Sequence, residues 1–305
     1  MTEGRVFNFS AGPAVLPLPV LEHAQKNLLN FQGSGLGILE MSHRGKLFED
    51  LLDTAEKNLR ELLGLSDDFD ICFTTGGATM QFSMVPMNLG LKGQKANYLV
   101  TGEWAKKALA EAKKFTETHV ASTSEDKNFC YIPKECQVSD NPAYLHFTSN
   151  NTIFGTQFRS EPNFGPNGGN APLICDASSD FLSRPLDMKK YGMIYAGAQK
   201  NAGPAGITIV VIRKELLARS PQNLPILLDY NTYTKNKSLY NTNPTFPVYV
   251  VGEVLKWIKA EGGLKAMEKH NQEKAAILYE AIDATGFYKG TADRDSRSLM
   301  NVTFR

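Results

Sequence analysis

Cysteine is scarce in this sequence and is not spaced for metal or disulfide chemistry. The four residues, Cys72, Cys130, Cys136 and Cys175, form no C-x-x-C pair and have no neighbouring histidine cluster. A zinc site or a disulfide framework would require such spacings. The sequence therefore predicts free thiols and no bound metal.

The sequence also lacks an excess of charge of either sign and any long apolar run. Its 33 basic and 32 acidic residues leave a formal net charge of +1, which gives no reason to expect nucleic acid as a partner. The apolar run 207–212 is far too short to span a bilayer. The N-terminus has neither the basic start nor the apolar stretch of a secretory signal. We expect a cytoplasmic protein with no membrane partner.

Short apolar runs alternate with amphipathic stretches along the chain, a pattern typical of an α/β domain. Continuous apolar runs predict strands buried on both faces at 71–74, 97–101, 119–122, 144–148, 173–175, 193–196 and 207–212. Helical spacing predicts helices over 20–28 and 51–63, and two more on either side of Gly262 and Gly263. Residues 221–247, rich in Asn, Thr, Tyr and Pro, are expected to form a long ordered loop, and 299–304 a further strand.

The most specific stretch, YAGAQKNAGPAG at 195–206, places Lys200 in a glycine-rich turn between two apolar runs. A lysine that forms a Schiff base needs a fixed position, small neighbours that admit a planar cofactor, and burial that favours the neutral amine. An isolated lysine in such a turn is more often a surface residue. However, Asp176 ends the preceding apolar run, where a carboxylate can pair with the protonated ring nitrogen of pyridoxal phosphate (PLP). The Asp–Lys pair at successive strand ends favours a PLP enzyme.

A second glycine-rich turn, GGAT at 76–79, follows a predicted strand and opens an apparent helix. Its backbone N–H groups and helix dipole could bind a phosphate, although it lacks the Gly-Lys-Ser/Thr ending of a P-loop. Trp104 starts another helix after the next strand. Its ring could stack on a pyridine ring, the alternative being an ordinary position in the core.

In this order the motifs resemble the phosphoserine aminotransferase family, class V enzymes of PLP fold type I. The resemblance extends over essentially the whole chain and includes FNFSAGPA at 7–14, MSHR at 41–44 and YNTNPTF at 240–246. It implies a large domain, residues 16–255, with a seven-stranded, mainly parallel sheet and helices on both faces. A small α/β domain would comprise residues 1–15 and 256–305 and would lack its C-terminal part.

The resemblance implies a cofactor site made of Gly77, Ala78, Thr79, Trp104, Thr152, Asp176, Gln199, Lys200, Asn241 and Thr242. Lys200 would form the Schiff base and move the proton, Asp176 would bind the pyridinium nitrogen, and Trp104 would stack on the ring. Thr152 would bond the phenolic oxygen, and Gln199 would lie near the phosphate. Many relatives have Gly or Arg where this chain has Ala78 and Thr79.

The resemblance also implies a homodimer with active sites at the subunit interface. Asn241 and Thr242 would reach the phosphate of the partner's cofactor. His43 and Arg44 would face the partner's site and hold the phosphate or side-chain carboxylate of the substrate. An alternative for Arg44 is a salt bridge at a helix start. The implied reaction moves an amino group reversibly from L-glutamate to 3-phosphohydroxypyruvate, giving 2-oxoglutarate and O-phospho-L-serine in serine biosynthesis. Relatives continue past Arg305 with further substrate-binding residues, so we expect PLP binding with weakened or lost activity.

Two other interpretations stay open from the sequence. Another fold type I enzyme, such as a serine–pyruvate or alanine–glyoxylate aminotransferase or a cysteine desulfurase, would share the Asp–Lys pair but lack the His43–Arg44 element. A non-catalytic PLP-binding dimer is the second possibility. Comparing phosphoserine with alanine as amino donor would separate the enzymes.

Overall fold

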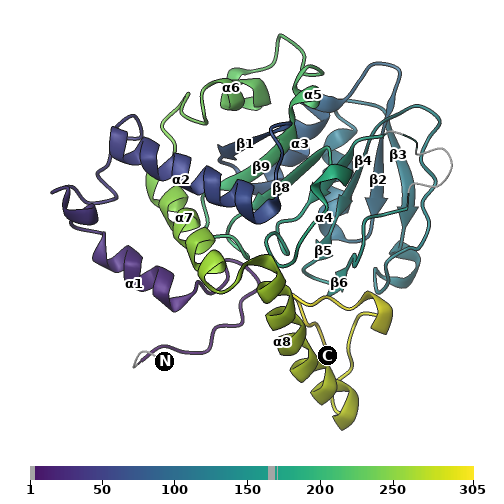
Figure 1. Cartoon of the computed structure of the whole chain (residues 1–305). Coiled ribbons are helices and arrows are strands. Elements are labelled where there is room, and N and C mark those ends of the chain that lie inside the picture. The colour runs from purple at the N-terminus through teal and green to yellow at the C-terminus, as the bar shows by residue number, and fades with distance from the viewer. Residues whose placement is uncertain (1–3, 164–168, 170) are drawn as a thin grey trace.

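The computed structural model describes residues 4–163, 169 and 171–305. A seven-stranded sheet lies at its centre (Figure 1), with the order β1-β9-β8-β7-β4-β2-β3. Its strands are β1 (Phe69–Thr74), β2 (Lys95–Val100), β3 (Thr118–Thr123), β4 (Pro142–Thr148), β7 (Leu173–Asp176), β8 (Met193–Gly197) and β9 (Thr208–Arg213). Adjacent strands are parallel except at β9, which is antiparallel to β8 and to β1. All seven predicted strands are present, and the α/β class with a mainly parallel sheet is confirmed.

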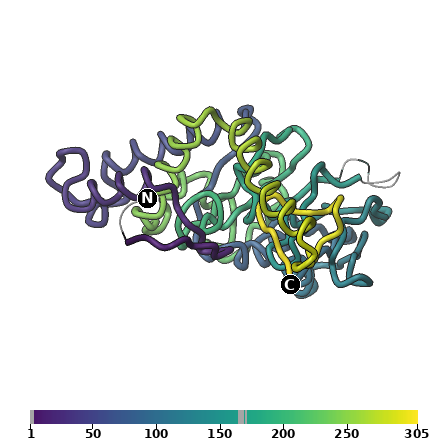
Figure 2. The backbone as a smooth tube through the Cα atoms, turned by 90° about the horizontal axis from the view of Figure 1, so that it is seen from below, coloured from purple at the N-terminus to yellow at the C-terminus, as the bar shows by residue number. Residues whose placement is uncertain are grey.

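Helices cover both faces of the sheet. One face packs against α2 (Lys46–Leu63) and α7 (Thr245–Ala260). The other face packs against α3 (Gly77–Leu89), α4 (Glu103–Ala112), α5 (Lys214–Leu217) and α6 (Tyr230–Lys235). α1 (Leu18–Lys26) contacts α7, and α8 (Gly263–Thr285) leads into the C-terminal part of the chain. Figure 2 places α1 toward one end of the molecule and the yellow C-terminal part toward the other.

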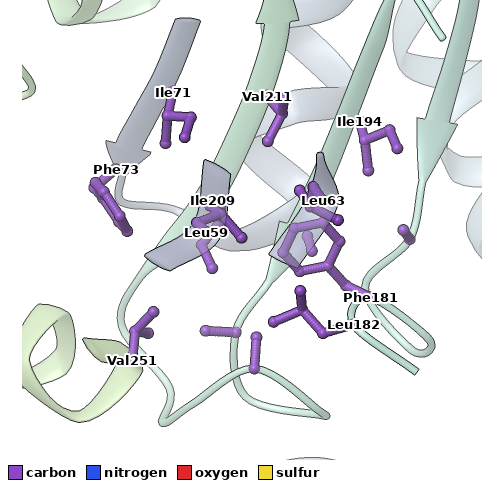
Figure 3. Packing of buried hydrophobic residues seen from close by; sticks show 14 of the residues in the cluster. Leu59, Leu63, Ile71, Phe73, Phe181, Leu182, Ile194, Ile209, Val211 and Val251 are labelled. Atoms are coloured by element: carbon purple, nitrogen blue, oxygen red, sulfur yellow. The ribbon is translucent and has the colours of Figure 1, made fainter. Parts of the chain in front are cut away.

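Alternate residues of the central strands enter the two cores, which explains the continuous apolar runs. Figure 3 shows the first core, where Leu59 and Leu63 of α2 pack near Ile71, Ile209 and Val211 of the sheet. α2 ends as predicted, because Gly64 adopts a left-handed conformation with φ of 61° that favours glycine. None of the helices in the described ranges is long and apolar enough to cross a membrane.

The predicted loop over 221–247 is wrong. This segment contains the short helices η4 (Ile226–Leu228) and α6, and α7 begins within it at Thr245. α6 forms because Asp229 caps it, accepting a hydrogen bond from the backbone N–H of Asn231 at 2.9 Å. The side chains of Tyr230 and Tyr233 then bury against the sheet. The polar and aromatic composition does not predict α6, which is only six residues long.

The predicted strand at 299–304 is also wrong, because only Phe304 forms a β-bridge, with Gly290. A small hairpin that the sequence did not predict, β5 (Asn150–Asn151) and β6 (Thr156–Gln157), pairs instead with itself. α7 runs across residue 255, where we placed the boundary between the two domains. That division of the chain stays a prediction.

A buried histidine makes the stability of this fold depend on pH. His146 of β4 is 1% exposed, and its Nε2 lies 2.8 Å from the hydroxyl of Tyr195. Burial lowers the pKa of His146 to about 3. An unfolded histidine titrates near pH 6.5, so below that pH the unfolded chain binds one proton more than the folded chain. The titration of His146 therefore does not lower the free energy of unfolding above about pH 6.5. Below that pH, the free energy of unfolding falls as the pH decreases toward the folded pKa.

We expect His146→Gln to remove this pH dependence, because glutamine can still hydrogen-bond Tyr195 but does not titrate. Between about pH 6.5 and about pH 4.5, the parent should lose up to about 1.4 kcal/mol more per pH unit than the variant. Urea unfolding at each pH measures the difference. His119→Gln, which alters a partly exposed histidine of β3, is the control. Equal slopes for parent and His146→Gln would contradict the prediction.

Candidate active site

Lys200 lies in the turn between β8 and β9, at the edge of the sheet where the parallel strands end. Its Nζ donates hydrogen bonds to Thr152 Oγ1 at 2.5 Å and to Ser179 Oγ at 3.1 Å. Burial lowers the pKa of the Lys200 amine, and the charges of Asp176 and Asp180 partly oppose this effect. The turn thus presents a desolvated amine, as a Schiff-base lysine requires.

Asp176 ends β7 and is 3% exposed. Its Oδ1 accepts hydrogen bonds from the backbone N–H of Ser178 at 3.0 Å and from the Ser178 hydroxyl at 2.7 Å. That hydroxyl also accepts from the Gly197 N–H at 3.1 Å, which ties Asp176 to β8. Among the described residues no group hydrogen-bonds Oδ2. Burial raises the pKa of Asp176, opposed by Ser178 and by the charge of Lys200. Oδ2 is thus available to a cationic N–H donor.

The predicted phosphate site lies at the same edge of the sheet. β9 is antiparallel to both β1 and β8, so β1 and β8 run in one direction and end on the same side. Gly76 and Gly77 follow β1 with positive φ of 84° and 63°, and α3 begins without a side-chain cap. The N–H groups of Gly77, Ala78 and Thr79 in its first turn need partners other than helix carbonyls. An anion such as phosphate satisfies that need.

Trp104 lies in the first turn of α4, directly after β2. The centre of its ring is 5.5 Å from Lys200 Nζ, so the two predicted residues do come together. The indole Nε1 is buried and, within the described part of the chain, has no hydrogen-bond partner. The free oxygen of Asp176 suits a protonated ring nitrogen, and the Trp104 ring beside the Lys200 amine suits a planar group. The residues present fit PLP.

The N-terminal segment covers one side of Lys200. A Cβ atom on Gly12 would lie 2.8 Å from Lys200 Cγ, so only glycine fits there without displacing the lysine stem. The N–H of Ala14 donates to the carbonyl of Gln199 at 2.8 Å, and the Gln199 side chain lies against Gly197. Gly12 belongs to the FNFSAGPA motif at 7–14, but the motif alone does not predict this contact with Lys200.

Sequence reasoning also missed Ser179 and Asp180. Ser179 touches Lys200, and Asp180 is a second buried carboxylate, which accepts hydrogen bonds from the hydroxyl of Ser149 and from Gln157 Nε2. The string DASSD at 176–180 places them one turn beyond Asp176. Its density of small polar residues after an apolar run was the available signal.

Four predicted residues lie apart from this cluster within the chain. His43, Arg44, Asn241 and Thr242 form no hydrogen bond or ion pair with Lys200 or Asp176 in the described ranges. Arg44 and Thr242 are exposed, and the side chain of Asn241 hydrogen-bonds only the neighbouring Thr242 carbonyl, at 3.3 Å. His43 Nε2 is buried without a partner among the described residues. Their roles in the site stay predictions.

The C-terminal segment, residues 296–303, is hydrogen-bonded to the hairpin that presents Thr152. Ser298 is fully buried and donates from its hydroxyl to Asn150 Oδ1, while Asn150 Nδ2 donates to Asn301 Oδ1 at 2.7 Å. The N–H of Leu299 donates to Gln157 Oε1 at 2.9 Å. Gln157 in turn donates to Asp180 at 3.0 Å. The hairpin is therefore held between the C-terminal segment and the turn after β7.

The fold and this cluster together define a PLP-dependent aminotransferase of fold type I. A profile of the class-V aminotransferases matches residues 6–305. The chain is 53% identical to the phosphoserine aminotransferase of Desulfatibacillum aliphaticivorans, over 99% of this chain and 83% of that relative. It is 52% identical to the phosphoserine aminotransferase of Niallia circulans, with the same coverage of both chains.

Solved structures of phosphoserine aminotransferases show the same similarity. Phosphoserine aminotransferase from Bacillus circulans subsp. alkalophilus superposes with a TM-score of 0.95 at 52% identity, covering 99% of this chain and 83% of that one. The PLP-bound enzyme from Trichomonas vaginalis gives a TM-score of 0.92 at 40% identity, covering 98% and 84%. The chain therefore belongs to the class-V aminotransferase family and, within it, to the phosphoserine aminotransferases.

Proposed function

We propose that this chain catalyses the reversible transfer of an amino group from L-glutamate to 3-phosphohydroxypyruvate, giving O-phospho-L-serine and 2-oxoglutarate in serine biosynthesis, with PLP bound at Lys200. One observation supports this most directly. A chain about half identical to phosphoserine aminotransferases brings a desolvated lysine amine, a buried carboxylate with a free oxygen, and a tryptophan ring together at one sheet edge.

Each residue has a defined task in this proposal. PLP, when bound, supplies an electron-withdrawing ring that stabilises negative charge at the substrate carbon. Asp176 Oδ2 would hold a proton on the ring nitrogen, and the Trp104 ring would orient the planar group. The N–H groups at the start of α3 bind the phosphate. Lys200 Nζ would take the proton from the substrate carbon and hold it until the second proton transfer.

We further propose a cytoplasmic homodimer in which His43, Arg44, Asn241 and Thr242 complete the partner's site. Large apolar side chains near the N-terminus support this assembly, since Phe7 is 73%, Phe9 87% and Leu29 89% exposed. Apolar surface of this kind usually marks an interaction site. The weakened activity expected from the sequence stays a prediction.

The substrate is tested by a half-reaction. Purified chain loaded with PLP is mixed with O-phospho-L-serine, and the absorbance of the lysine-bound cofactor and the release of 3-phosphohydroxypyruvate are followed. We expect phosphoserine to abolish the absorbance of the lysine-bound cofactor, and L-alanine at the same concentration to leave this absorbance unchanged. Loss of the absorbance with alanine but not with phosphoserine would contradict the proposed substrate. No absorbance band after loading would contradict the cofactor site at Lys200.

A further inference from the structure

Ser179 contacts the amine of Lys200, although nothing in the sequence assigned it a role. Ser179 is 7% exposed, and its hydroxyl oxygen lies 3.1 Å from Lys200 Nζ and 2.7 Å from Thr152 Oγ1. Thr152 Oγ1 is itself 2.5 Å from Nζ. Each of the three polar atoms is therefore within hydrogen-bond distance of the other two.

Two hydroxyl groups can bind a lysine amine in either protonation state. An ammonium group has three N–H donors, and both hydroxyl oxygens can accept from it. A neutral amine has a lone pair, and either hydroxyl can rotate to donate to it. Hydrogen bonds from the ammonium are the stronger of the two sets, because one partner is charged. The hydroxyl pair therefore opposes burial, which lowers the pKa of Lys200.

The two hydroxyls are not equivalent once the cofactor is bound. In the function proposed above, Thr152 bonds the phenolic oxygen of PLP, and its hydroxyl has a single hydrogen to donate. Ser179 is then the hydroxyl that can both accept from the Lys200 ammonium and donate to the neutral amine, whereas Thr152 can only accept. We propose that Ser179 is a further catalytic residue, whose hydroxyl binds the Lys200 amine and holds the proton there between the two proton transfers. The proposal rests on the function proposed for Lys200.

The charges around Nζ allow the contribution of Ser179 to be isolated. Asp176 at the end of β7 and Asp180 in the turn after it are the two charged groups that act on Lys200 within the described ranges. Lys107 of α4 lies over the Trp104 ring, 4.6 Å from its centre, on which Lys200 also lies. The β5–β6 hairpin offers the uncharged Thr152, and the N-terminal segment offers Gly12. Ser179→Ala leaves all of these groups unchanged.

The experiment measures the protonation of Lys200 without cofactor. The full chain, freed of PLP, is labelled briefly with acetic anhydride at a series of pH values, and acetylation of the Lys200 peptide is quantified by mass spectrometry. We expect Ser179→Ala to move the midpoint of the labelling profile to lower pH, because the ammonium loses an acceptor. Below the midpoint, labelling should be about fivefold faster than in the parent, and at high pH the rates should converge.

Matched variants separate this role from a purely structural one. Ser179→Thr retains the hydroxyl and should keep the midpoint of the parent. Ser183→Ala removes another buried hydroxyl, four residues further on, and should also keep it. If the alanine variant does not fold, Ser179→Cys, with its weak thiol donor and acceptor, should give the same shift to lower pH.

An unchanged or raised midpoint in Ser179→Ala, or an equal shift in Ser183→Ala, overturns the proposal. A change confined to the rate at high pH would reflect access to the amine alone and also overturns it. Borohydride reduction of the PLP-loaded parent keeps this result separate from the proposed function. If PLP attaches to Lys200 in the parent while the midpoint does not move, only the role of Ser179 fails. If PLP does not attach, the function proposed for Lys200 fails.

Discussion

Lys200→Ala should abolish covalent attachment of PLP and lower the rate of transamination by roughly a hundredfold to ten-thousandfold, the usual contribution of a positioned acid–base group. The amine is the only group that the proposed function uses both to bind the cofactor and to move the proton. The substitution should leave the fold intact, because Nζ is bonded only to the hydroxyls of Thr152 and Ser179 among the described residues. After loading with PLP and reduction with borohydride, the mass of the peptide that contains residue 200 shows whether PLP is attached.

Lys189→Ala is the matched control for this experiment, since Lys189 is an exposed lysine on the connection between β7 and β8. It should retain both the mass increase and the rate of the parent. A reduced adduct on another lysine, with activity preserved in Lys200→Ala, would assign the reaction to a different residue.

Asp176→Asn should lower the rate of transamination by about two to three and a half orders of magnitude. Asparagine Oδ1 can still accept the two hydrogen bonds from Ser178, so the turn should keep its geometry. The amide has no negative charge, however, and the proton on the ring nitrogen loses its partner. Breaking a buried ion pair from one side costs about 3–5 kcal/mol, and each 1.4 kcal/mol is a factor of about ten in rate.

The single-turnover rate of the phosphoserine half-reaction measures this effect apart from binding. An analogue of PLP with a permanently positive ring nitrogen, such as the N-methylated form, should restore part of the rate in Asp176→Asn. Asp187→Asn changes an exposed carboxylate in the same connection and should behave as the parent. Similar rates for Asp176→Asn and the parent would show that the charge of Asp176 has no part in the reaction.

The central sheet could be predicted from the sequence because strands buried on both faces need apolar residues at every position. Each run in the sequence matches a strand to within a few residues at either end. α6 and the β5–β6 hairpin could not be predicted, because they are short and their residues are polar or aromatic. They form through contacts distant in sequence, such as the hydrogen bond from Tyr230 to Gln81 at 2.7 Å.

The pairing of Lys200 with Asp176 could be anticipated because parallel strands end at a common edge. The contacts of Ser179, Asp180 and Gly12 could not be anticipated. They depend on which segments pack together in the folded chain. His43, Arg44, Asn241 and Thr242 form no contact with the site in the described part of the chain. Their roles are implied by the resemblance and belong to the proposed homodimer.

The attachment of residues 296–303 to the β5–β6 hairpin has a consequence for how this enzyme can vary. Asn301 and Ser298 touch neither Lys200 nor Asp176, yet through Asn150 they help to fix the loop that presents the Thr152 hydroxyl. Substitutions in residues 296–303 are therefore expected to affect catalysis as well as stability. Replacing residues 296–303 would therefore also change the surroundings of the Lys200 amine, through the hydrogen bonds that join Asn301 to Asn150 and Lys200 to Thr152.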